Sequence, residues 1–308
     1  MSSGAPLASI VVVTKDRKDE ALRAVWSAVA QAGDVEVIVV DDGSSDGTAD
    51  AVREEFPSVR IVRFDASAGL IVRRNEAGEL ARGRYVFSID DDAELSVQTT
   101  VLDTVGAFEE ERVGAVAIPY VDMPADTEVR QLAPDDANVY VTNSFRGTAY
   151  AVRRDVFLAL GGFRGEFLHQ AEEREFCLRM LSAGRVVALG RGAPIRHFVS
   201  PSRDVNRMWF NGCRNDIWTV WRYVPMPYLP GRLVKAVVHL LWLGLGVRRP
   251  VLFLRGTLAG LRSAFSTSRR PMPRRLYRLY RRLEQREAVP LREIVGSLPA
   301  LSKPGGEG

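Results

Sequence analysis

Residues 85–94 read Tyr-Val-Phe-Ser-Ile-Asp-Asp-Asp-Ala-Glu, an apolar run that ends in three consecutive aspartates. The run is short and apolar, which predicts a strand over 84–89 that is buried on both faces of a sheet. Three adjacent carboxylates repel one another unless they are well solvated or a cation neutralises them. Ligands bind at the carboxyl ends of the strands in an open parallel sheet, so Asp90–Asp92 predict a divalent metal and a phosphate-bearing substrate. The alternative interpretation is a solvated turn, because aspartate is common in turns.

The chain on both sides of this stretch alternates between strand and helix patterns. Continuous β-branched runs predict buried strands, and segments with apolar residues at helical spacing lie between them. The predicted strands are 8–14, 35–40, 59–64, 84–89 and 113–120, with a further short strand at 149–152. The predicted helices are 19–32, 48–55, 70–82, 99–111, 154–160 and 172–183. This order predicts an α/β fold with a mostly parallel, Rossmann-like sheet, right-handed crossovers and flanking helices.

Polar loops with candidate ligand-binding residues follow the first two predicted strands. Asp42 ends the second strand and precedes the Gly/Ser loop 43–47, so its carboxylate can accept hydrogen bonds from a nucleobase N–H or a ribose hydroxyl. Asp16 and Arg17 follow the first strand and can contact a nucleotide, and Arg74 on the third helix can reach its phosphates. The alternatives are a capped helix start, an ordinary charged loop and a solvated helix face. These loops lack the Gly-Lys-Ser/Thr of a Walker phosphate loop.

In this order the motifs closely resemble glycosyltransferase family 2, whose members have the GT-A fold. The resemblance is carried by Thr14-Lys-Asp-Arg17, Val40-Asp-Asp-Gly-Ser-Ser-Asp-Gly-Thr48, Arg74-Asn75, Ile89-Asp-Asp-Asp92, Gly147–Phe157, Gly161-Gly-Phe163 and Glu172–Arg179. It covers about residues 8–200 and implies a nucleoside-diphosphate-sugar donor, with Asp42 at the base and a divalent metal, Mg²⁺ or Mn²⁺, at the diphosphate. It implies the donor-binding residues Thr14, Asp16, Arg17, Asp42, Arg74 and Asp91, and the metal ligands Asp90, Asp92 and His197. The alternatives for His197 are a contact with the diphosphate and a structural role.

The resemblance also implies that the general base lies at the start of the predicted helix 172–183. Family members usually have an aspartate at the position of Glu173, so the base of this chain is one methylene longer. A base must come within about 2.6–3.2 Å of the acceptor hydroxyl. We therefore expect Glu173 to be the catalytic base, with Glu172 and Glu175 as alternatives. The structural alternative is a helix start enriched in glutamate for its dipole.

The last third of the chain differs sharply in charge from the rest. Residues 1–200 hold 32 acidic and 22 basic side chains, whereas residues 201–308 hold 6 acidic and 20 basic ones. Such a split marks the C-terminal part as a surface for an anionic partner, and an anionic membrane leaflet suits it. We expect a GT-A domain in 1–205 and a helical, basic region in 206–308 that associates with the acceptor or the membrane.

Two apolar stretches, 233–247 and 251–265, follow an aromatic-rich segment in this region. Both contain basic residues and are shorter than the roughly 20 residues of a membrane span, so we expect two interfacial helices rather than a transmembrane hairpin. The alternative is a core or dimer-packing helix pair. The Gln-x-x-Arg-Trp motif of processive synthases is absent from the sequence, which favours single-sugar addition, as in non-processive bacterial members.

Cys177 and Cys213 lack metal-ligand spacing, and we expect no structural disulfide between them, which fits a reducing cytoplasm. The first seven residues lack a secretory pattern. We therefore expect a cytoplasmic protein that is peripheral on the inner face of the membrane. The expected function is inverting, metal-dependent transfer of a hexosyl or deoxyhexosyl group. The expected donor is a UDP- or dTDP-sugar, and the acceptor is a lipid-linked, surface-glycan or small-molecule hydroxyl. The alternatives are a nucleotidyltransferase and a non-catalytic membrane- or nucleic-acid-binding protein. The first would have glycines in loop 14–17, and the acidic first part of the chain disfavours nucleic acid.

Overall fold

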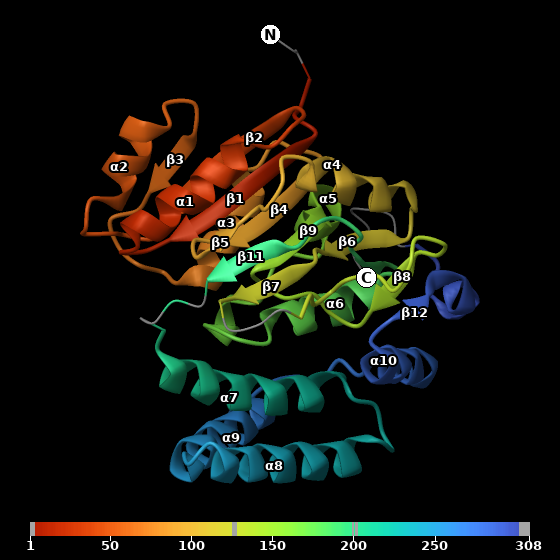
Figure 1. Ribbon diagram of the computed structural model, residues 1–308. Helices are drawn as coiled ribbons and strands as arrows, with labels where there is room; N and C mark the ends of the chain where they lie inside the picture. Colours follow the sequence, from red (N-terminus) through yellow and green to blue (C-terminus); the bar gives the residue numbers. More distant parts are fainter. Residues whose placement is uncertain (1–3, 125–127, 199, 201–202, 302–308) are drawn as a thin grey trace.

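The computed structural model describes residues 4–124, 128–198, 200 and 203–301. Its main sheet contains β1 (Ala8–Thr14), β2 (Val35–Asp41), β3 (Arg60–Arg63), β4 (Tyr85–Asp90), β6 (Val113–Ala117), β8 (Tyr140–Thr142), β9 (Ala149–Arg153), β10 (Val186–Leu189) and β12 (Val289–Pro290). The strand order is β12-β8-β10-β6-β9-β4-β1-β2-β3 (Figure 1). Strands β3, β2, β1 and β4 are parallel, whereas β9 runs antiparallel between β4 and β6. The predicted α/β fold is confirmed, and the predicted short strand 149–152 is β9, whose antiparallel pairing the periodicity did not predict.

Helices pack against this sheet and extend beyond it. They are α1 (Lys18–Val29), α2 (Thr48–Glu55), α3 (Leu70–Leu80), α4 (Thr100–Val105), α5 (Arg154–Ala159), α6 (Glu172–Ser182), α7 (Val205–Tyr223), α8 (Leu229–Gly246), α9 (Pro250–Phe265) and α10 (Arg274–Arg286). The predicted helix 99–111 is wrong in its second half, where the chain forms a 3₁₀ helix over Gly106–Glu109. Glycine favours a helix interior less than other residues except proline, which explains the change at Gly106.

The predicted strand 113–120 is two strands that belong to different sheets. Pro119 has no N–H to donate to the ladder, and β6 ends two residues before it. The chain then forms β7 (Tyr120–Met123), which joins β5 (Ala93–Glu94) and β11 (Ile195–Phe198) in the order β5-β11-β7. This small sheet was not predicted. It places β11 beside the segment that follows the three aspartates.

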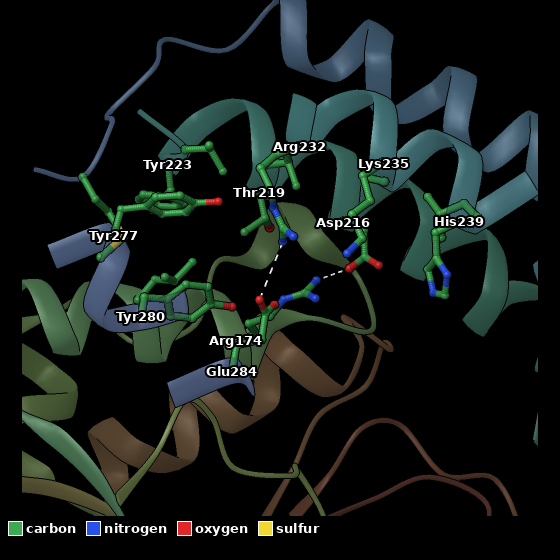
Figure 2. Close-up of a pocket in the computed structure, with 16 residues that line it drawn as sticks. Arg174, Asp216, Thr219, Tyr223, Arg232, Lys235, His239, Tyr277, Tyr280 and Glu284 are labelled. Atoms are coloured by element: carbon green, nitrogen blue, oxygen red, sulfur yellow. Dashed lines mark hydrogen bonds and ion pairs between the residues drawn. The ribbon is translucent and has the colours of Figure 1, made fainter. Parts of the chain in front are cut away.

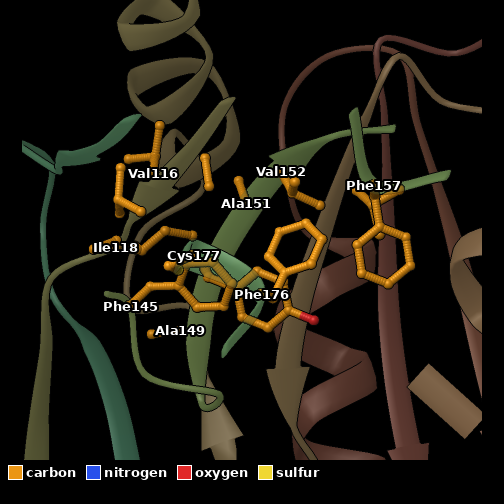
Figure 3. Close-up of a cluster of buried hydrophobic side chains, with 14 of the residues drawn as sticks. Val116, Ile118, Phe145, Ala149, Ala151, Val152, Phe157, Phe176 and Cys177 are labelled. Carbon is orange, nitrogen blue, oxygen red and sulfur yellow. The ribbon is translucent and has the colours of Figure 1, made fainter. Parts of the chain in front are cut away.

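An aromatic cluster fixes α6 against the main sheet. Phe176 of α6 is fully buried and contacts Phe145, Phe157 and Phe163, with ring centroids 5.3–6.3 Å apart. Figure 3 shows this cluster beside the side chains of β6 and β9. Removing a buried phenylalanine side chain typically costs about 3–5 kcal/mol. The packing therefore holds the start of α6 at a fixed place relative to the sheet.

The C-terminal region forms a helical layer that remains connected to the sheet. Helices α7, α8 and α9 stack together next to the sheet domain, and α10 leads back to β12 at the sheet edge (Figure 1). The predicted helices 233–247 and 251–265 correspond to α8 and α9. Within the described residues, α8 is the one helix long and apolar enough to cross a membrane by length and composition. The division near residue 205 stays a prediction, and β12 shows that the later part is not purely helical.

Candidate active site

The polar residues singled out in the sequence gather at one edge of the main sheet. In the parallel register Thr14 lies opposite Asp41, and Val13 lies opposite Asp90. The loops that continue from β1, β2 and β4 therefore leave the sheet side by side. This is the edge at which open α/β sheets bind ligands.

Asp42 organises the loop in front of α3. Its two carboxylate oxygens accept hydrogen bonds from four donors: Ser67 Oγ (2.6 Å), Ala68 N (2.8 Å), Gly69 N (3.0 Å) and Arg73 Nε (2.7 Å). Burial opposes ionisation, yet these donors hold the pKa of Asp42 below its usual range. Four donors fill the acceptor positions of a carboxylate. The expected contact between Asp42 and a nucleobase stays a prediction, and it requires one of these donors to be released.

Asp16 joins the loop after β1 to the loop after β2. Its backbone is left-handed (φ 50°), its N–H donates to Ser44 Oγ at 2.9 Å, and its Oδ1 accepts from the Ser45 N–H at 2.7 Å. In the structure these contacts make Asp16 a connector of two loops. Its predicted contact with the donor remains a prediction.

Arg17 lies against the second and third aspartates of the cluster. Its Nη1 is 2.8 Å from Asp91 Oδ1 and 3.6 Å from Asp92 Oδ2. Burial raises the pKa of Asp91 to about 6, although Arg17 opposes the shift. Thr14 is buried at the end of β1, on the same side of the site. Arg17 therefore relieves part of the repulsion predicted among these carboxylates.

Asp90, Asp92 and His197 come together as a candidate metal centre. One ligand atom from each lies within 4.8 Å of the others. Asp92 Oδ1 is buried and has no hydrogen-bond donor among the described residues. His197 is held by Asp122, whose Oδ1 lies 2.5 Å from Nδ1, as is usual for a histidine ligand. Two carboxylates and an imidazole are donors that suit Mn²⁺ or Mg²⁺, so the residues present fit the expected metal.

Arg203 bridges two of these candidate ligands and was not predicted. Its Nη2 lies 2.9 Å from Asp92 Oδ2 and 2.7 Å from His197 Nε2. Nε2 of His197 also lies 3.4 Å from Asp92 Oδ1, so this ring nitrogen faces both a guanidinium and a carboxylate. Although burial opposes it, His197 and Arg203 lower the pKa of Asp92 to about 2. The only sequence signal for Arg203 is its place in the basic segment after residue 200.

Arg74 connects the aspartate cluster to the start of α6. Its Nη2 lies 2.6 Å from Asp90 Oδ1 and donates to the Gly147 carbonyl at 2.9 Å. Its Nη1 lies 3.5 Å from Glu172 Oε1 and 3.9 Å from Glu173 Oε1. Burial and the charge of Glu173 raise the pKa of Glu172 to about 8, and burial also raises the pKa of Glu173, while Arg74 opposes both shifts.

The three candidate bases occupy different environments. Glu175 is fully buried between Arg164 and Arg179, and it also accepts a hydrogen bond from Tyr223. The side chain of Glu172 is 3% exposed, whereas that of Glu173 is 18% exposed. Glu175 is therefore occupied by structural ion pairs, and Glu173 is the most accessible of the three to an acceptor.

The backbone that leads into α6 is strained and is held by the C-terminal region. Three of its non-glycine residues have left-handed backbone angles: Leu168 (φ 62°), Gln170 (φ 69°) and Ala171 (φ 69°). Such residues each cost about 1–3 kcal/mol. Asn215 of α7 is buried, and its Nδ2 donates to the carbonyls of Phe167 (3.0 Å), His169 (2.9 Å) and Gln170 (2.7 Å). No motif in the sequence predicted this support.

Comparison with known proteins agrees with this geometry. Residues 9–158 match the family model for Glycosyl transferase family 2. The chain is 33% identical over 96 residues to a putative teichuronic acid biosynthesis glycosyltransferase, TuaG, of Bacillus subtilis, an alignment that covers 30% of this chain and 38% of the relative. It is 30% identical over 109 residues to the Escherichia coli protein WfaP, UDP-Glc:alpha-D-GlcNAc-diphosphoundecaprenol beta-1,3-glucosyltransferase, covering 35% of this chain and 43% of the relative. The chain thus spans less than half the length of these two relatives.

The fold is also similar to that of a solved mannosyltransferase. The structure of PcManGT from Pyrobaculum calidifontis, in complex with GDP-Man and Mn²⁺, superposes with a TM-score of 0.59 at 22% identity, covering 86% of this chain and 77% of that one. This likeness supports the fold, while the matched residues 9–158 contain the loops after β1, β2 and β4. Residues 9–158 thus form a glycosyltransferase family 2 domain, and the fold is that of the GT-A glycosyltransferases.

Proposed function

We propose that this protein is an inverting, metal-dependent glycosyltransferase that transfers a sugar from a nucleoside-diphosphate sugar to a hydroxyl of a cell-envelope glycan precursor. The observation that carries the proposal is the connection of the Asp90, Asp92 and His197 cluster, through Arg74, to the accessible carboxylate of Glu173. A cation-binding group and a base thus lie on either side of one buried arginine. Inverting transfer needs both a neutralised leaving group and a base for the acceptor.

Each residue has a separate task in this proposal. Glu173 takes the proton from the acceptor hydroxyl, whose oxygen attacks the anomeric carbon on the face opposite the nucleotide. Asp90, Asp92 and His197 would hold the divalent cation, which when bound supplies a Lewis acid for the diphosphate leaving group. Arg74 fixes Glu173 relative to Asp90. Burial raises the pKa of Glu173, which makes its carboxylate a stronger base than an exposed glutamate.

The donor we propose is a UDP- or dTDP-sugar. One relative is named for UDP-Glc, whereas the solved mannosyltransferase contains GDP-Man, so the nucleobase of the donor is to be identified by experiment. Uracil and thymine each offer a ring N–H that can donate to the carboxylate of an aspartate after β2. For Asp42 to serve, the nucleotide must replace one of the donors from the segment 67–69.

We propose a lipid-linked acceptor at the inner face of the cytoplasmic membrane. The outer side of α8 exposes Val234, Val238 and Trp242, and α9 exposes Leu254 and Leu258. Basic residues flank this apolar surface, the combination expected of helices that lie in an anionic interface. The relative named for a diphosphoundecaprenol acceptor is in keeping with this proposal.

Thermal unfolding with UDP, dTDP and GDP, each with Mn²⁺ and then with excess EDTA, tests the donor site. A ligand at about 100 times its Kd stabilises the folded state by about 2.7 kcal/mol. We expect a metal-dependent rise in Tm with one nucleotide and no metal-dependent rise in Asp92→Ala. No shift with any nucleotide would contradict the proposal.

A transfer assay with the identified donor tests the base. Glu173→Gln is expected to lower kcat by about 10²–10⁴-fold, the usual contribution of a positioned base. The matched control is Glu79→Gln, which neutralises an exposed glutamate at the far end of α3. Equal activity of the two variants would exclude Glu173 as the base, and pyrophosphate release from a nucleoside triphosphate would favour nucleotidyl transfer instead.

A further inference from the structure

A cavity lies between α6, α7, α8 and α10. Its volume is about 270 Å³, close to the lower end of the range for small-molecule sites. Figure 2 shows polar side chains from all four helices around it, among them Arg174, Asp216, Lys235 and Glu284. Arg174 directly follows Glu173 in the sequence. The cavity therefore lies on another side of α6 from the active site.

The wall of this cavity has more positive than negative charge. Arg174 is paired with Asp216, and Arg232 shares Glu284 with Arg281. Lys235 also lines the cavity, and no carboxylate lies within ion-pair distance of it among the described residues. Three basic side chains of the wall thus face two carboxylates, and one of these, Glu284, is shared with Arg281 from outside the wall.

Neutral groups in the wall do not correct this imbalance. Burial raises the pKa of Tyr277 and of Tyr280, so both hydroxyls stay neutral near pH 7. Nε of Arg174, Nε of Arg232 and Oγ1 of Thr219 are buried without a hydrogen-bond partner among the described residues. These groups can all donate, and water can satisfy them without neutralising the charge. An anion with several acceptor oxygens satisfies both needs.

We propose that this cavity is a binding site for a phosphate group, with Arg174, Arg232 and Lys235 as its basic ligands. Phosphate offers several acceptor oxygens and at least one negative charge, and arginine pairs well with it. The cavity borders α8, in which Lys235 lines the cavity while Val234 and Val238 are exposed. The phosphate is either a free soluble anion or the headgroup of a lipid whose chains lie along that apolar surface.

The site is tested on the full chain with EDTA present, so that a metal-dependent donor site does not contribute. Inorganic phosphate and pyrophosphate are titrated by calorimetry, and vesicles of phosphatidylcholine with or without phosphatidic acid are used in flotation. Lys235→Ala removes a largely exposed cation that has no ion pair to break. Arg255→Ala is the charge-matched control, because Arg255 is exposed on α9 and does not line the cavity.

We expect saturable binding that Lys235→Ala weakens about tenfold and Arg255→Ala leaves unchanged. Binding of phosphate or pyrophosphate in this pattern identifies a soluble anion as the ligand. Binding of phosphatidic acid vesicles alone in this pattern identifies a lipid headgroup. No saturable binding, or an equal loss in both variants, would overturn the site. Because EDTA is present throughout, these results are independent of the nucleotide shifts that test the proposed transferase activity.

Discussion

A substitution at Gly147 tests whether the position of the Glu173 carboxylate controls the rate of the reaction. A Cβ added at Gly147 would lie 2.3 Å from Glu173 Oε1 and 2.8 Å from Arg74 Nη1. Ordinary van der Waals contact begins at 3.4 Å, so in Gly147→Ala the carboxylate must move by about 1.1 Å. A misplacement of about 1 Å at a reacting group can cost about 100-fold in rate, which corresponds to ~2.7 kcal/mol in the barrier.

The measurement is kcat of Gly147→Ala with the identified donor and acceptor, beside its Tm and its affinity for nucleotide and Mn²⁺. We expect kcat to fall about 100-fold while Tm and donor affinity change little. Gly106→Ala is the matched control, because its added Cβ would meet no atom within 4 Å and its backbone is not left-handed. Full kcat in Gly147→Ala would refute the reasoning, and so would a loss explained by a lower Tm.

A second substitution distinguishes the effect on Glu173 from a general disturbance. Glu173→Asp shortens the base by one C–C bond, about 1.5 Å, which exceeds the 1.1 Å overlap. If the methyl group acts by displacing the carboxylate, Gly147→Ala should lower kcat much less in the Glu173→Asp background than in the parent. Equal losses in both backgrounds would instead implicate Arg74.

Three further predictions concern the surroundings of the site. Burial and the charge of Glu173 raise the pKa of Glu172 from its usual 4.5 to about 8, so Tm should fall as pH rises from about 4.5 to about 8, and a pH series should show a smaller fall in Tm for Glu172→Gln. Arg203→Ala removes a cation from beside Asp92 and should tighten Mn²⁺ binding without nucleotide about fivefold (~1 kcal/mol) by electron paramagnetic resonance; weaker binding would exclude competition. Asn215→Ala leaves three carbonyls without their donor and should cost about 1–3 kcal/mol and speed amide exchange in 168–171, whereas unchanged exchange would contradict the support we assign to it.

The fold was predictable where pattern and neighbour contacts agree. The buried runs 8–14 and 35–40 are strands, and 48–55 is a helix with the predicted bounds, because local periodicity and burial favour the same structure there. Strand 113–120 failed at Pro119, where the loss of one N–H outweighs a continuous apolar run. The partner of a strand depends on contacts distant in sequence, so the antiparallel pairing of β9 and the small sheet could not be derived from periodicity.

The candidate site was likewise predictable where a local motif marks a residue and not where the contact is distant in the sequence. Asp90, Asp92 and His197 were expected as metal ligands, and the structure brings their ligand atoms together, although binding itself remains a prediction. Arg203 and Asn215 were missed because the contact of Arg203 with Asp92 and the contacts of Asn215 with the segment 167–170 join residues distant in the sequence. Asp42 was found by its place at a strand end, but its four donors come from a segment whose geometry no spacing rule predicts.

Helix α6 connects the catalytic edge to the C-terminal region through consecutive residues. An α-helix turns about 100° per residue, so Glu173, Arg174 and Glu175 point in three directions. Glu173 faces Arg74 and Gly147. Arg174 pairs with Asp216 of α7, and Glu175 accepts a hydrogen bond from Tyr223 at the end of α7. Through its contacts with Arg174 and Glu175, helix α7 therefore fixes the orientation of the proposed base. The same helix also holds the strained segment that precedes α6. We therefore expect a change in how α7 packs to alter the position of Glu173, and Arg74 would transmit part of that change to Asp90.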